Sequence, residues 1–84
     1  MTEYMIEVHV TPRAGILDPQ GKAVQHALQS LEFADVEDVR VGRLIRVRMK
    51  ATSPADARAR VDDMCRRLLA NPVTEDYSIT VGAQ

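Results

Sequence analysis

The sequence predicts an α+β fold: a small antiparallel sheet of three to four strands in β-α-β(β)-α-β order, with two helices on one face, as in ferredoxin-like proteins. The chain opens with alternating apolar and polar residues, which is typical of a half-buried strand. Two later segments each begin with a helix-start pattern and continue with an apolar stripe at helical spacing. With 84 residues, the chain is expected to form a single domain over residues 1–84 with a small core.

The first strand is predicted to end at Thr11-Pro12, because proline cannot donate to a strand ladder. Its even positions are expected to face inward and its odd positions outward. The inward residues are Tyr4, Ile6, Val8 and Val10.

The first helix is predicted over residues 19–33. Asp18 is a strong N-cap residue, and Pro19 suits the first helical position because its missing N–H has no partner there. Gly21 is costly in a helix, by roughly 1 kcal/mol relative to alanine. Either the glycine is merely tolerated near the helix start, which these residues alone favour, or something there needs a bare backbone. The apolar stripe of this helix consists of Val24, Ala27, Leu28 and Leu31.

Residues 36–50 have the composition of a strand and allow two interpretations. Most even positions are charged, whereas the apolar residues stand at odd positions: Val39, Val41, Ile45, Val47 and Met49. A hairpin with a three-residue loop at 42–44 keeps the apolar face intact, and so does one long strand bent at Gly42. The pattern does not choose between them.

The second helix is predicted to begin at Ser53-Pro54, with Ser53 as N-cap, and to stop at Asn71-Pro72. A final strand carries Tyr77, Ile79 and Val81 on one face. The expected buried stripe of the helix is Ala57, Val61, Met64, Cys65 and Leu68.

Composition narrows the functional classes. The net charge of −1, from 11 basic and 12 acidic residues, gives no bulk attraction to nucleic acid or to a membrane surface. The lone Cys65 argues for a reducing, cytoplasmic setting, and no apolar run is long enough to span a bilayer. Residual apolar character on both sheet faces, at Tyr4, Met5 and Leu44, favours pairing with a second copy.

No catalytic or metal site is expected. His9, His26 and Cys65 lack ligand-like spacing, and no serine has a positioned base. Adjacent carboxylates such as Asp62 and Asp63 point apart on a helix, so they form no acid–base dyad. The residues alone therefore indicate an interaction or regulatory subunit.

The stretch from Val8 to Val24, which contains Leu-Asp-Pro-Gln-Gly-Lys, resembles the opening of the PurS family. The resemblance continues through 27–28, 39–43, Asn71-Pro72 and the strand with Tyr77, and so covers nearly the whole chain. Two positions differ: Glu32 stands where the family usually has glycine after the first helix, and Arg43 follows Gly42 where lysine is common. The first difference puts the end of that helix in question.

The resemblance implies a non-catalytic small subunit of phosphoribosylformylglycinamidine (FGAM) synthase, in the fourth step of purine biosynthesis. Such a subunit assembles with itself, as a dimer or tetramer, and joins the ATP-dependent PurL subunit to the PurQ glutaminase so that ammonia passes between them. ATP and Mg are then expected on the large subunit, with no cofactor in this chain.

The residues expected to make the interactions are Asp18, Pro19, Gln20, Gly21 and Lys22 at the helix start, with Gly42 and Arg43 at the bend of the central segment. The alternative is a regulatory domain that binds a small metabolite at a dimer interface, in a site lined by Gly15 and Gly21.

Overall fold

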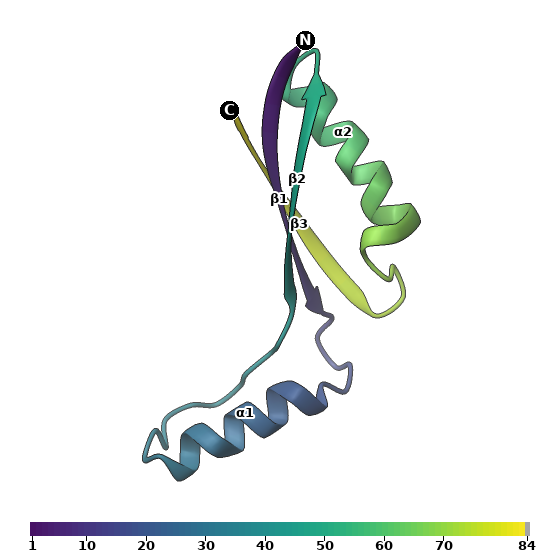
Figure 1. Cartoon of the computed structure of the whole chain (residues 1–84). Helices are drawn as coiled ribbons and strands as arrows, with labels where there is room; N and C mark the ends of the chain where they lie inside the picture. The colour runs from purple at the N-terminus through teal and green to yellow at the C-terminus, as the bar shows by residue number, and fades with distance from the viewer. Residues whose placement is uncertain (84) are drawn as a thin grey trace.

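A computed structural model describes residues 1–83 and shows a three-stranded sheet with one helix packed on it and a second helix set apart (Figure 1). The strands are β1 (Thr2–Pro12), β2 (Arg43–Ala51) and β3 (Glu75–Ala83). The helices are α1 (Pro19–Ser30) and α2 (Pro54–Met64), and α2 continues as a π-helical turn, η1 (Cys65–Leu69). The predicted α+β class and β-α-β-α-β order are confirmed.

The sheet has the order β2-β1-β3, and both pairings are antiparallel. Val8 lies opposite Ile45 on one side and Ile79 on the other, so the apolar positions of all three strands share one face. The even residues of β1 are buried as predicted. The core consists of Tyr4, Ile6, Val8, Val10, Ala51, Ala57, Val61, Cys65 and Ala70.

The second helix covers the apolar face of the sheet and ends differently from the prediction. Ser53 Oγ accepts a hydrogen bond from the Asp56 N–H at 3.0 Å, which is the predicted N-cap. The expected burial of Leu68 is wrong, because its side chain is 81% exposed. The wider turn of η1 rotates the last residues, and Leu69 packs against the core instead.

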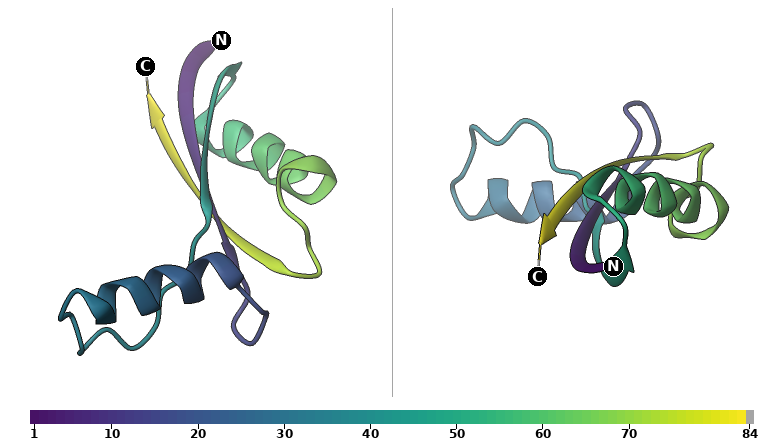
Figure 2. Two further views of the ribbon diagram at one scale, coloured as in Figure 1. Left: turned by 60° about the horizontal axis from the view of Figure 1, so that its bottom comes forward. Right: turned by 90° about the horizontal axis from the view of Figure 1, so that it is seen from above.

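The first helix does not pack on the sheet, so the predicted arrangement of two helices on one face holds only for α2. Figures 1 and 2 show α1 beyond the end of the sheet, at one end of a molecule that measures 51 × 27 × 14 Å. Its stripe is therefore uncovered: Leu31 is 67% exposed, and Phe33, which follows the helix, is 53% exposed. We call residues 13–42 the arm and the rest of the described chain the body.

Residues 36–42 form neither a hairpin nor the first half of a long strand, and both interpretations of this segment are wrong. Only the second half is a strand, β2. The first half runs back along α1, where Gln25 Nε2 donates to the Glu37 carbonyl oxygen and Gln29 Nε2 to that of Val36. It has no strand to pair with, because β1, the strand beside β2, pairs no further than Val10 opposite Arg43 and ends at Pro12.

The sheet face opposite α2 is polar rather than apolar. Glu7 pairs with Arg46 at 3.1 Å and Glu3 with Arg48 at 3.2 Å, in each case across β1 and β2. Of the residues expected to give apolar character to both faces, Tyr4 is buried in the core, whereas Leu44 is 47% exposed on this face. The exposed apolar side chains of the molecule lie mainly on the arm.

Candidate interaction site at the base of the first helix

Asp18 joins the start of α1 to the returning chain. Its Oδ1 accepts a hydrogen bond from the Gly21 N–H at 3.0 Å, as an N-cap, and its Oδ2 accepts one from the Val41 N–H at 2.9 Å. These N–H groups stabilise the carboxylate and hold the pKa of Asp18 below its ordinary value of 3.8. One side chain thus fixes both chain segments that form the arm.

Position 21 has no room for a side chain, because residues 36–42 pass close to it. The glycine is buried, and a Cβ at this position would overlap the carbonyl oxygen of Val39 and the Asp18 carboxylate. Gly42 is restricted in the same way, since a Cβ there would overlap the carbonyl oxygen of Val10. Both glycines therefore serve close approaches within the chain, which explains the cost of Gly21 in a helix.

The Arg43 side chain also forms its hydrogen bonds with other residues of the same chain. Its Nη1 and Nη2 contact the two carboxylate oxygens of Glu75 at 2.7 and 2.9 Å, and Nη2 also donates to the Leu69 carbonyl oxygen at 2.7 Å. The hydrogen bonds between the two side chains raise the pKa of Arg43 and lower that of Glu75. The sequence singled out Arg43 but not Glu75, because a partner 32 residues away leaves no local pattern.

Of the remaining predicted residues, only Lys22 lines a cavity, which has a volume of about 360 Å³ and lies at the base of the arm. Lys22 lines it and forms no ion pair with any residue of 1–83, whereas Arg13 pairs with Asp76 and Arg40 with Asp38. Pro19 occupies the first turn and Gln20 is exposed beside it. Of the two glycines proposed for a metabolite site, only Gly15 lines this cavity.

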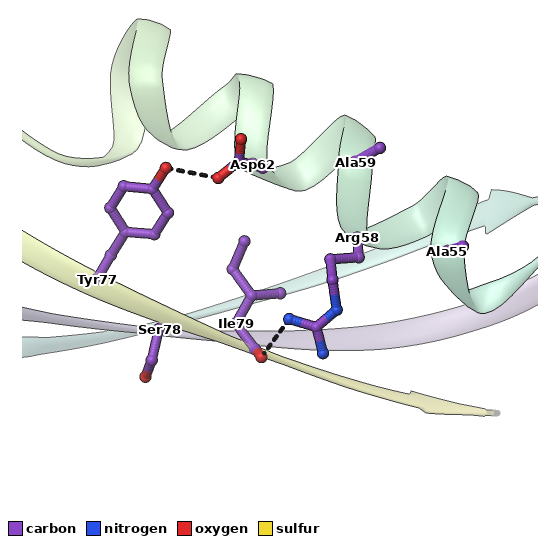
Figure 3. Close-up of a pocket in the computed structure, with 7 residues that line it drawn as sticks. All are labelled: Ala55, Arg58, Ala59, Asp62, Tyr77, Ser78 and Ile79. Carbon is purple, nitrogen blue, oxygen red and sulfur yellow. Dashed lines mark hydrogen bonds between the residues drawn. The ribbon is translucent and has the colours of Figure 1, made fainter.

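A second cavity, of about 640 Å³, lies between α2 and the outer strand β3 (Figure 3). Its polar groups are already engaged: Tyr77 Oη donates to Asp62 Oδ1 at 2.6 Å, and Arg58 Nη1 donates to the Ile79 carbonyl oxygen at 2.9 Å. The hydrogen bond to Asp62 raises the pKa of Tyr77, so the phenol stays protonated. The lining offers no nucleophile with a base beside it.

The described part of the chain holds no cluster of three or more metal-ligating side chains. Within residues 1–83, no helix combines the length and the apolar character that crossing a membrane requires. Cys65 is buried in the core, and burial raises the pKa of its thiol.

The family model for PurS, phosphoribosylformylglycinamidine (FGAM) synthase, matches residues 5–83. The chain belongs to the PurS family. It is 44% identical to the PurS subunit of Bacillus subtilis FGAM synthase over 78 residues, which are 93% of this chain and 92% of that protein. It is 41% identical to the Synechocystis PurS subunit over 80 residues, which are 95% of this chain and 80% of that one.

Solved PurS structures share the fold. Thermus thermophilus PurS superimposes with a TM-score of 0.86 at 35% identity, covering 98% of both chains. A chain in the structure of PurLQS from Thermotoga maritima superimposes with a TM-score of 0.87 at 27% identity, covering 98% of this chain and all of that one. The resemblance seen in the sequence is thus confirmed, and the family places the chain with the subunits of FGAM synthase.

Proposed function

We propose that the chain is the non-catalytic small subunit of an FGAM synthase, and that it joins a PurL subunit to a PurQ glutaminase so that ammonia passes between their sites. The observation that carries the proposal is the match to a chain of the Thermotoga maritima PurLQS, which extends over the whole of that chain. In this assignment ATP and Mg bind to PurL, and the complex works in the cytoplasm.

The test is reconstitution with PurL and PurQ from the same organism. Adding the chain is expected to switch on formation of FGAM with glutamine as nitrogen donor, while the reaction of PurL with free ammonia does not need it. An equal rate from glutamine without the chain would contradict the proposal, and so would ligase or glutaminase turnover by the chain alone.

We also propose that the chain assembles with itself through the arm. The apolar stripe of α1 is uncovered, and on the helix side of β2 the residues Ile45, Val47 and Met49 are only half-buried. Burial of apolar surface stabilises association by about 25 cal/mol per Å² before the costs of binding. The α1 stripe of one copy against β2 of the other would cover both surfaces at once.

Leu31→Ser tests this contact, because Leu31 is exposed on the arm and its replacement leaves the core untouched. The variant is expected to self-associate roughly tenfold more weakly in sedimentation experiments, which corresponds to about 1.4 kcal/mol. Leu68→Ser is the matched control, since Leu68 is as exposed but lies on the body. Equal effects of the two substitutions would contradict a contact through α1.

A further inference from the structure

The arm is attached to the body at two points on neighbouring strands, after Pro12 of β1 and before Arg43 of β2. Since α1 does not pack on the sheet, the direction of the arm depends on how the chain is held at these two points (Figure 1). On the β1 side, the Arg13 N–H donates to the Thr74 carbonyl oxygen at 2.9 Å. On the β2 side, the holding group is the Arg43 side chain.

Arg43 connects three elements at that point, and we call Arg43, Leu69 and Glu75 the joint. Arg43 is the first residue of β2, Leu69 the last residue of η1 and Glu75 the first residue of β3. Glu75 is itself held, because its Oε1 accepts a hydrogen bond from the Asn71 N–H at 2.7 Å and its side chain is only 19% exposed. A bidentate pair of this kind fixes the angle between its partners as well as their distance.

The other ion pairs of the sheet lack this geometry. Arg46 contacts Glu7 through a single Nε–Oε2 approach of 3.1 Å, and 66% of the arginine side chain is exposed. That pair connects two strands that are already hydrogen-bonded to each other, so it adds no new connection. The joint, in contrast, ties the first residue of β2, which directly follows the arm, to the end of η1 and the start of β3.

The joint also lies next to the tightest backbone contact of the arm. Gly42, the residue before Arg43, packs against the Val10 carbonyl oxygen with no room for a Cβ. The guanidinium of Arg43 holds the residue that directly follows this close contact.

We propose that Arg43 and Glu75 are positioning residues for assembly: they fix the direction in which the arm leaves the body and so present α1 to its partner, without having to touch the partner themselves. This inference rests on the proposed self-association through the arm. It gives Arg43 a role inside the chain, in place of the direct contact that the sequence led us to expect.

The experiment measures arm direction and assembly separately. Spin labels on Ser30→Cys in α1 and Thr80→Cys in β3, both exposed positions, report the distance between arm and body; Cys65 is fully buried and does not react in the folded chain. Doubly labelled chains are diluted with unlabelled chains of the same variant, so that only distances within one chain are read. Sedimentation gives the association constant.

The variants are Arg43→Ala and Glu75→Ala, with Arg46→Ala as the matched control. Each removes one partner of an ion pair, but only the first two affect the joint. Arg43→Lys is a milder variant in case the alanine variants unfold, since lysine keeps the charge and loses the bidentate geometry. Circular dichroism shows which variants keep the fold.

We expect the distance distribution to broaden in Arg43→Ala and Glu75→Ala, less so in Arg43→Lys, and to stay narrow in Arg46→Ala. Self-association should weaken about tenfold in the first two, while the control stays near wild type. A narrow distance distribution in folded Arg43→Ala would contradict the proposal that the joint fixes the direction of the arm. A broad distribution with unchanged association overturns its role in assembly. A wild-type chain that stays monomeric contradicts the proposed self-association instead, and its distance distribution still decides on the joint.

Discussion

The body and the arm contain similar helices that differ in what covers them. Both α1 and α2 have proline in the first turn. Each follows an N-cap residue, Asp18 or Ser53, whose side chain accepts a hydrogen bond from a backbone N–H. Yet α2 buries Ala57 and Val61 against the sheet, whereas the only buried residue of α1 is Gly21. The comparison teaches that an apolar stripe predicts a covered helix but does not say which chain covers it.

The largest expected effect lies in the body. Ile6 is fully buried between β2 and β3, so Ile6→Ala removes buried methyl groups and leaves a cavity. We expect a loss of about 2–5 kcal/mol in the free energy of unfolding, measured by urea denaturation at a concentration where the chain is monomeric. Val24→Ala, on the exposed arm, should change that value by no more than about 0.5 kcal/mol. Similar losses would mean that the arm is part of the same core.

The next effect tests the close approach inside the arm. Gly21→Val places a branched side chain where the Val39 carbonyl oxygen lies, so residues 36–42 must move away from α1. We expect the body to stay folded, by circular dichroism, while self-association falls in gel filtration; overpacking of this kind costs about 1–3 kcal/mol. Gly82→Ala is the control, because its Cβ would meet Met5 at an ordinary 3.6 Å. An unchanged assembly of Gly21→Val would show that residues 36–42 do not shape the contact.

A smaller effect, of opposite sign, is expected at the end of α1. Glu32 has a φ of 76°, in the left-handed region, where the Phe33 N–H donates to the Leu28 carbonyl oxygen and the Glu32 N–H to that of Gln29. This is a Schellman ending, which favours glycine at that position. Glu32→Gly should therefore stabilise the arm by up to about 1 kcal/mol.

The protection of the α1 amides against hydrogen exchange measures this change. Protection should rise in Glu32→Gly, whereas the amides of α2 serve as the internal reference and should not change. Faster exchange in α1 would mean that the Glu32 side chain contributes more than its backbone conformation costs.

The smallest expected effect is a pH dependence of the arm. Asp18 has a pKa below its ordinary 3.8, so it stabilises the fold above that pH and loses this contribution as the pH falls further, through its native pKa. The NMR signals of the Gly21 and Val41 amides should shift together in that range. Asp18→Asn, which keeps a capping oxygen but cannot titrate, should abolish the shift. A shift that persists in the variant would assign the titration to another group.

Much of the secondary structure could be predicted from the sequence, because its signals are local. The alternation in β1 and the cap-proline pairs at 18–19 and 53–54 each fix an element within a few residues. Even the departure at Glu32 marked the place where α1 ends, although the helix stops at Ser30 rather than at 33. The π-helical turn was missed, since nothing in the sequence of 65–69 distinguishes it from an α-helix.

That the residues at the base of the arm contact a partner stays a prediction, and the sequence did not reveal the contacts that they make within the chain. Asp18, Gly21 and Gly42 lie together at the base of the arm. The groups they meet, on Val39, Val41 and Val10, are backbone carbonyl oxygens and a backbone N–H, which are not specific to any side chain. A backbone group has no sequence signature, so its presence could not be inferred. The same holds for the placement of α1, whose stripe is identical whether it packs on its own sheet or on another.

The exposed arm has a consequence for the amount of this subunit in a cell. A copy that has not found its partners shows Leu31 and Phe33 to solvent on a segment joined to the body only through residues 12–13 and 42–43. Proteases and chaperones select such apolar, loosely attached segments. We therefore expect surplus copies to be degraded first, so that the quantity of this small chain follows the quantity of the larger subunits that we propose it joins.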